Sequence, residues 1–475
     1  MIVAAIRCLV APGEPRISPL TALGGSSILP PEPPASYQAT SHSLMSIASN
    51  NHDPTLVAGP AQYSRQLGER AKSAARYLRD LSTSIKNEWL ERSAEHLMHR
   101  MEVVLEANAR DVALARDIGL TTAAIDRLLL TPERLNSIAK ALRSIAALPD
   151  PVGEILGGGV RPNGLQIQKV RVPLGVLLFI YESRPNVTVD AAAIAIKSGN
   201  AILLRGGKES LHSSSALVTL LEETSHQVGL PEHAIQFVAT SDRSVVGELL
   251  QLDDCIDLVI PRGGEGLIRR VVSEARMPVL KHYTGNCHVY VDEHADLEMA
   301  KRIVINAKTQ RMGVCNAAES LLVHGAIANS FLPMVTKGLK EYGIELRADT
   351  RAIEIIADAT PATDTDWSAE YLGPILSIGV VDSLEQAIDH IQRYGSHHTD
   401  AIVTREISRA HQFARQVDSA AVMINCSTRF HDGGEIGLGA EIGISTDKLH
   451  ARGPCGLQEL TTYKYIVTGE GHIRE

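Results

Sequence analysis

The chain has 475 residues, of which 44% are hydrophobic and 21% charged, and its formal net charge is −9 at pH 7. This length predicts two or more domains with sizeable cores, and the acidic balance argues against nucleic acid as the main partner. No apolar run reaches the roughly 18 residues of a membrane-spanning helix, so we expect no membrane partner.

The first 57 residues differ in composition from the rest of the chain. They are rich in Ser, Thr and Pro, include the run Pro30-Pro31-Glu32-Pro33-Pro34, and show no sustained periodicity. This composition is typical of a disordered extension. The sequence leaves open whether Met45 is the true start.

A helical region and a hairpin are expected next. Apolar residues at three- and four-residue spacings predict helices from 61 to 118, and a further helix is expected at 133–147. Residues 165–172 alternate apolar and polar, as a half-exposed strand does. Gly157-Gly158-Gly159 before it reads as a turn. An exposed hairpin here would offer an edge to another subunit.

Two α/β series follow. The first alternates apolar strands with helices, and we expect strands at 175–180, 201–204, 234–238 and 256–260. The second series is predicted to hold a helix at 330–340 and strands at 289–291, 321–323, 375–381, 401–403 and 421–424, before a last strand at 461–467. Apolar strands alternating with helices predict parallel sheets covered on both faces, with ligands bound at the carboxyl ends of the strands.

Cys315 is the strongest candidate for a reactive group. It lies at the end of a Gly-containing turn, between a helical run and an apolar strand, with Lys308 and Arg311 nearby in sequence. Exposure beside cations would lower the pKa of its thiol from about 8.5 towards neutrality and favour a nucleophilic thiolate. The alternative is a buried structural cysteine.

The six cysteines are widely scattered and form neither a CxxC pair nor a Cys/His cluster with zinc spacing. We therefore predict no metal site and no disulfide. Reduced cysteines in a large soluble protein are typical of the cytoplasm, which is the location we expect.

Two glycine-bearing strand ends could approach a dinucleotide. The first carries Arg205 and Lys208 around Gly206-Gly207, and the second carries Gly263 and Gly264 before a helix whose free N–H groups favour a phosphate. Neither is a GxGxxG motif, so a plain turn is an alternative at each.

Three polar segments follow strands or enclose turns. Asn186, after the strand 175–180, could donate to a developing oxyanion. Glu370 precedes a Gly-Pro turn and could accept hydrogen bonds from ribose hydroxyls. Arg429 lies in a long Gly-rich stretch and could pair with a substrate carboxylate. Ordinary capping or solvated loops are the alternatives.

Together these residues resemble the aldehyde dehydrogenase superfamily, and within it the γ-glutamyl phosphate reductase family. The resemblance covers about residues 58–475. Its most specific segments are YESRPNVT (181–188), KHYTGNCH (281–288), GLGAEIGIST (437–446) and KLHARGP (448–454). It makes Cys315 the nucleophile and Glu370 the ligand of the nicotinamide ribose.

The fold that this resemblance implies is an aldehyde dehydrogenase-like α/β architecture. A Rossmann-like NADP-binding domain is expected at 58–159 and 173–279, and a catalytic domain at 280–460. Oligomerisation strands are expected at 160–172 and 461–475, and the resemblance suggests a homodimer or homotetramer.

The reaction implied is NADPH-dependent reduction of L-glutamyl 5-phosphate to L-glutamate 5-semialdehyde and phosphate through a thioester on Cys315, in the biosynthesis of proline. Asn186 would hold the oxyanion, and Ser427, Arg429 and Lys448 would grip the α-carboxylate or the phosphate. Lys208, with Arg205, stands where NAD-using relatives often carry a Glu, which favours NADP. Handover of the labile phosphate from glutamate 5-kinase is a further expectation.

One difference between this sequence and the superfamily distinguishes reduction of an acyl phosphate from hydrolytic aldehyde oxidation. Relatives that hydrolyse their thioester carry a Glu general base where this chain has His282-Tyr283-Thr284-Gly285, so no carboxylate is expected there. This favours acyl phosphate chemistry. The alternative is an NAD-dependent hydrolytic aldehyde dehydrogenase.

Overall fold

The structure is a computed structural model that describes residues 59–474. The predicted disordered extension and the question of Met45 lie outside the described residues. Five helices come first: α2 (Pro60–Leu78), α3 (Thr83–His99), α4 (Met101–Asp117), α5 (Thr122–Leu128) and α6 (Pro132–Ala147). The predicted helical region is thus divided, partly because the Ser82 side chain caps α3 by accepting from the N–H of Ile85.

The first parallel sheet has four strands in the order β5 (Ile235–Phe237), β4 (Ala201–Arg205), β3 (Val176–Tyr181) and β6 (Leu258–Arg262). All six residues of β3 are buried, as expected for a strand covered on both faces. The helices of this unit are α7 (Pro185–Lys197), α8 (Leu211–Val228), α9 (Ser244–Leu249) and α10 (Glu265–Glu274). The chain continues from β3 to β4 and β5 on one side of β3, and β6 then lies on the other side. Parallel α/β sheets bind ligands at the carboxyl ends of the strands where the order changes direction in this way.

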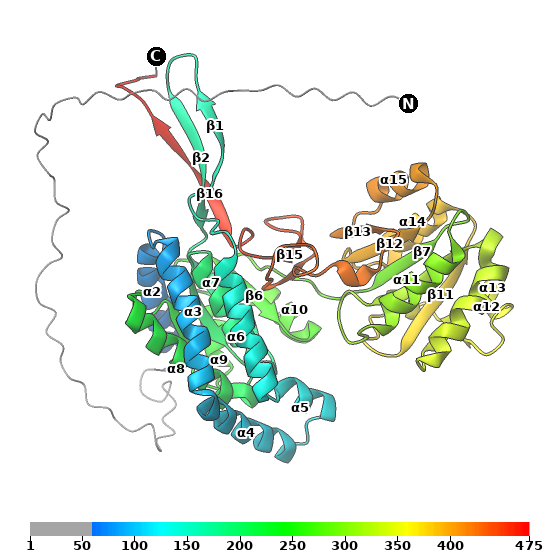
Figure 1. The fold of residues 1–475 in the computed structure, drawn as a ribbon, viewed down its shortest axis with the longest axis horizontal. Coiled ribbons are helices and arrows are strands. Elements are labelled where there is room, and N and C mark those ends of the chain that lie inside the picture. The colour runs from blue at the N-terminus through cyan, green and yellow to red at the C-terminus, as the bar shows by residue number, and fades with distance from the viewer. Residues whose placement is uncertain (1–58, 475) are drawn as a thin grey trace, which may run out of the picture. The chain divides into compact units, whose positions relative to one another are not determined.

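The second parallel sheet has seven strands, in the order β10 (Thr360–Pro361), β9 (Glu345–Ala348), β11 (Ile375–Val381), β8 (Ala318–His324), β7 (Cys287–Val291), β12 (Thr399–Val403) and β13 (Ala421–Ile424). Alternate residues of its strands face opposite layers. Val289 and Val291 pack in the cluster that includes α11 (Leu297–Thr309) and α12 (Gly325–Glu341), whereas Tyr290 packs with α14 (Leu384–Tyr394) and α15 (Ile407–Gln416). The prediction of two parallel-sheet α/β units is confirmed (Figure 1).

The hairpin and the tail form one antiparallel sheet. β2 (Gln166–Pro173) pairs with β1 (Ile155–Val160) on one side and with β16 (Thr461–Thr468) on the other (Figure 1). The expected turn at Gly157-Gly158-Gly159 is wrong, because these glycines lie within β1. The hairpin therefore begins before the expected boundary at residue 160.

The structure differs from the sequence predictions at two further places, both after residue 280. The helix expected at 330–340 begins already at Gly325, so Pro333 lies inside α12. The Gly-rich stretch contains a short strand, β14 (Gly443–Ser445), which pairs with β15 (Gly453–Cys455). Among the helices that the structure describes, none combines the length and the apolarity needed to cross a membrane.

Candidate active site

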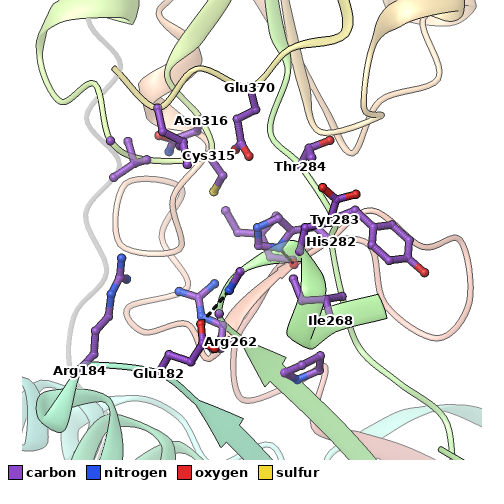
Figure 2. A pocket seen from close by; sticks show the side chains of 18 of the residues that line it. Glu182, Arg184, Arg262, Ile268, His282, Tyr283, Thr284, Cys315, Asn316 and Glu370 are labelled. Carbon is purple, nitrogen blue, oxygen red and sulfur yellow. Dashed lines mark hydrogen bonds between the residues drawn. The ribbon is translucent and has the colours of Figure 1, made fainter. Parts of the chain in front are cut away.

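A cavity of about 820 Å³ collects half of the predicted site residues, namely Cys315, Gly263, Gly264, Glu370 and Arg429. The segments 181–184 and 261–265, at the carboxyl ends of β3 and β6, form part of its lining. Residues 282–284, the turn around 311–316 before β8, and residues 368–372 form another part. Figure 2 shows the side chains of Cys315, Glu370, His282 and Arg262 around the same space.

Cys315 lies in the turn between α11 and β8, with its sulfur directed into the cavity (Figure 2). Its carbonyl oxygen accepts a hydrogen bond from the buried thiol of Cys287 at 3.2 Å. The next residue, Asn316, donates its side-chain amide to the carbonyl of His431 at 3.0 Å. These contacts hold the chain directly after the sulfur-bearing Cα while the thiol remains at the cavity.

The thiol of Cys315 is not activated in the way the sequence suggested. Burial raises its pKa to about 11; Arg262 acts in the lowering direction, whereas Glu370 and Glu441 raise it further. The expected lowering by Lys308 is wrong, because that ammonium is buried in an ion pair with Glu319. Lys308 is therefore part of the buried core, whereas the charges of Arg262, Arg184 and Arg429 interact with the thiol from the cavity.

Gly285 lies between Cys315, the predicted nucleophile, and the carboxylate of Glu370. Its N–H donates to Glu370 Oε1 at 2.8 Å. A Cβ atom at Gly285 would lie 1.9 Å from the carbonyl oxygen of Cys315, a distance at which the backbone must move. Only glycine allows these two segments to approach so closely.

Five carboxylates line the cavity, although the segment 282–285 has none, and two of the five, Glu370 and Glu441, act on the pKa of Cys315. Glu370 and Glu441 each accept a hydrogen bond from a backbone N–H, of Gly285 and Gly433 respectively. Burial raises the pKa of both groups. His282 also lines the cavity, and burial lowers its pKa to about 4.

Arginines line the cavity together with the carboxylates. Five of them contribute to its lining: Arg127, Arg184, Arg262, Arg311 and Arg429. The pKa of Arg184 is lowered by partial burial and then by the charges of three of the other arginines, which shows that these groups lie close to one another. Such a cluster is stabilised by an anion with more than one charged group.

Sequence reasoning missed Arg127 and Arg262. Arg262 is the last residue of a mostly buried strand, a position that could have indicated a site residue. Arg127 comes from α5, where nothing in the sequence pattern distinguishes it from a solvated surface cation.

The N-terminus of α10 is close to the nucleophile. Gly263 and Gly264, the two glycines predicted to bind a cofactor, line the cavity. The N–H of Gly264 donates to Glu182 Oε2 at 2.9 Å, so a carboxylate of the chain lies where an anion is favoured by the helix dipole. A Cβ atom at Gly263 would lie 2.4 Å from the same oxygen.

The other two predicted cofactor residues, Arg205 and Lys208, lie outside the cavity lining. Arg205 donates through Nη1 to the carbonyl of Gly206 at 2.9 Å, and its buried Nε has no hydrogen-bond partner among the described residues. Lys208 is exposed. The neighbouring Glu209 accepts hydrogen bonds from the backbone and the hydroxyl of Ser183.

Of the predicted substrate residues, only Arg429 lines the cavity, and its Nε donates to Gln310 Oε1 at 2.8 Å. Ser427 is buried and caps its own turn. Lys448 pairs with Asp418 at 2.7 Å, outside the lining. Asn186 lies in the first turn of α7, where its amide donates to Asp190 at 3.2 Å rather than into the cavity.

Comparison with known proteins agrees with this arrangement. The aldehyde dehydrogenase family model matches residues 56–354 and 353–441. A γ-glutamyl phosphate reductase of Rhodopirellula baltica is 58% identical over 433 residues, 90% of this chain and 100% of that protein. A γ-glutamyl phosphate reductase of Moorella thermoacetica is 56% identical over 86% of this chain and 98% of its own.

The chain belongs to the γ-glutamyl phosphate reductases of the aldehyde dehydrogenase family. The crystal structure of a γ-glutamyl phosphate reductase from Thermotoga maritima matches with a TM-score of 0.86 at 47% identity, covering 87% of this chain and 100% of that one. An acetylating aldehyde dehydrogenase of Geobacillus thermoglucosidasius, 19% identical over 88% of this chain and 98% of its own, shares the fold with a TM-score of 0.64. The predicted fold and family resemblance are thereby confirmed.

The raised pKa of Cys315 predicts slow alkylation of the free reductase at neutral pH. A thiol with a pKa of about 11 is ionised in about one molecule in ten thousand at pH 7, and the rate should rise about tenfold per pH unit towards that pKa. The measurement is iodoacetamide labelling of Cys315, located by mass spectrometry, between pH 6 and 10. In Arg262→Gln the pH profile of labelling should move to higher pH, because a charge that lowers the pKa of Cys315 is lost. A rate plateau at or below pH 8 in the wild type would contradict the raised pKa of Cys315.

The contact at Gly285 predicts a loss of turnover on the smallest substitution. Gly285→Ala should displace the Cys315 backbone and lower kcat by at least about a hundredfold, since a shift of about 1 Å can cost that much. Gly247→Ala is the matched control, because a Cβ there meets only atoms at 3.8 Å and beyond. Circular dichroism checks that both variants are folded. Equal kcat values in the two folded variants would show that the contact does not position the nucleophile.

Proposed function

We propose that this chain reduces L-glutamyl 5-phosphate to L-glutamate 5-semialdehyde and phosphate with NADPH, in the biosynthesis of proline. The observation that carries the proposal is the thiol of Cys315 at an arginine-lined cavity. The substrate carries both a carboxylate and a phosphate, which suits such a lining. The relatives that are 56% and 58% identical over nearly their whole lengths are γ-glutamyl phosphate reductases.

The proposed chemistry begins with ionised Cys315 attacking the acyl carbon of the substrate. A carbon–sulfur bond forms, the bond to the phosphate oxygen breaks, and phosphate leaves with its electron pair. Bound NADPH supplies the two-electron reduction of the resulting thioester. The carbon–sulfur bond then breaks, the semialdehyde leaves and the sulfur of Cys315 is restored.

The residues of the cavity have separate proposed tasks in that sequence. Arg262 favours the thiolate, because its charge lowers the pKa of Cys315. Arg184 and Arg429 would hold the anionic groups of the substrate. Backbone N–H groups beside Cys315 would hold the oxyanion, together with the amide of Asn186 or that of Asn316, which already lines the cavity.

A nicotinamide dinucleotide is the cofactor of this family, and the residues present fit one. Glu370 would accept from the nicotinamide ribose, and the N-terminus of α10 would hold phosphate once Glu182 releases Gly264. NADP is proposed because exposed Lys208 and the unpartnered Nε of Arg205 offer donors for a 2′-phosphate.

Further proposals concern the assembly and the setting. The NADP-binding domain would comprise residues 58–159 and 173–279, and the catalytic domain would comprise residues 280–460. The sheet of β1, β2 and β16 would join subunits into a homodimer or homotetramer, since β1 and β16 leave their outer edges unpaired among the described strands. We also propose a cytoplasmic location and handover of the labile substrate from glutamate 5-kinase.

The deciding experiment separates this function from hydrolytic aldehyde oxidation. NADP-linked oxidation of glutamate 5-semialdehyde should require phosphate or arsenate, because either anion must attack the thioester. A hydrolytic enzyme would proceed without them and would prefer NAD. Cys315→Ser should bind NADPH and lose several orders of magnitude in turnover, because an alcohol is a far weaker nucleophile; residual turnover within about tenfold of the wild type, or ~1.4 kcal/mol in barrier, would refute the role of the thiol.

Lys208 gives a test of the cofactor preference alone. Lys208→Glu should raise the KM for NADPH about tenfold or more and leave that for NADH within about twofold, because only NADPH carries the repelled 2′-phosphate. Lys140→Glu, an exposed cation of α6, makes the same charge change elsewhere. Equal KM shifts for both cofactors in Lys208→Glu would place the 2′-phosphate away from this lysine.

A further inference from the structure

Two histidines that are far apart in sequence converge on the sulfur of Cys315. His282, Cys315 and His398 each offer one ligand atom, and these atoms lie within 4.8 Å of one another. One thiolate and two imidazoles form a ligand set that Zn²⁺ favours. The sequence spacing concealed this cluster, because its members come from the segment before β7, the turn before β8 and the segment before β12.

His282 has one ring nitrogen engaged and one available. Its Nδ1 lies 2.9 Å from the carbonyl oxygen of Ile444, which can only accept, so Nδ1 carries the proton and donates. The neutral ring therefore presents the lone pair of Nε2. Metal-ligating histidines commonly make this second contact to a backbone carbonyl, which fixes the ring orientation.

His398 provides an independent observation. Its side chain is fully buried, and its Nε2 has no hydrogen-bond partner among the described residues. Its Nδ1 lies 2.7 Å from the hydroxyl of Thr399, which fixes the ring from the opposite side. Buried nitrogens without partners are rare and ask for an explanation, and a cation at the junction with Cys315 and His282 would satisfy this one.

We propose that His282, Cys315 and His398 form an inhibitory binding site for a divalent cation of the Zn²⁺ class. On binding, the S–H bond of Cys315 breaks, its proton passes to solvent and a sulfur–metal bond forms, with no change of oxidation state. Three protein ligands leave the fourth position of a tetrahedral ion to water on the cavity side. The bound ion occupies the electron pair that Cys315 needs for attack, and a chelator restores the free thiol.

Binding is tested on the untagged full chain without substrate, so the result does not depend on the proposed reaction. Co²⁺ serves as the spectroscopic probe, and equilibrium dialysis against Zn²⁺ gives the stoichiometry. One ion per chain and a thiolate-to-cobalt charge-transfer band in the near ultraviolet are expected. Absence of the band, or equal Zn²⁺ affinity in Cys315→Ser, would overturn the site.

Substitutions identify the two histidines. His282→Asn and His398→Asn should each weaken Zn²⁺ binding at least tenfold. His390→Asn is the matched control, because His390 also has an unpartnered Nε2 but packs against Trp367 and Tyr394, outside the cluster. An equal loss of affinity in all three variants would overturn the assignment.

A measurement on the wild type alone guards against misfolded variants. Zn²⁺ should slow alkylation of Cys315 at least tenfold, and EDTA should reverse the protection. Labelling of Cys426, which lies outside the cluster, should stay unchanged and serves as the internal reference. Alkylation of Cys315 that is insensitive to Zn²⁺ would refute the proposal even if every variant unfolds.

Discussion

The contact between Gly285 and the carbonyl of Cys315 is the constraint on which the site depends. It brings the segment before β7 against the turn before β8, and the same glycine donates its N–H to Glu370. The nucleophile, the predicted ribose ligand and His282, which lies in that segment, are thereby placed by backbone atoms rather than by flexible side chains. A site built in this way is rigid where positioning matters most.

Electrostatics around the sulfur have two opposing parts. Burial, Glu370 and Glu441 disfavour a thiolate, while Arg262 favours it. Burial lowers the pKa of Arg184, and the charges of three other arginines of the cavity lower it further. The resting protein therefore keeps a protonated sulfur in a cavity that is lined by both arginines and carboxylates.

Much of the architecture was predictable, because buried parallel strands leave long apolar runs. The strands at 375–381 and 421–424 were predicted with their observed bounds. The prediction of a turn failed where glycine was given its usual meaning, because Gly157-Gly158-Gly159 lie within β1, and the helix expected at 330–340 begins already at Gly325. Motifs found Cys315, Glu370, Gly263 and Gly264, but the partners of Lys308 and Lys448 depend on tertiary contacts that sequence proximity does not reveal.

A thiol held in its protonated form reacts slowly with oxidants as well as with electrophiles, because peroxide attacks the thiolate. The burial that raises the pKa of Cys315 thus protects the resting protein from sulfenic and sulfinic acid formation. The vulnerability of Cys315 would be greatest during turnover, in the brief interval when the sulfur is ionised and no acyl group yet covers it.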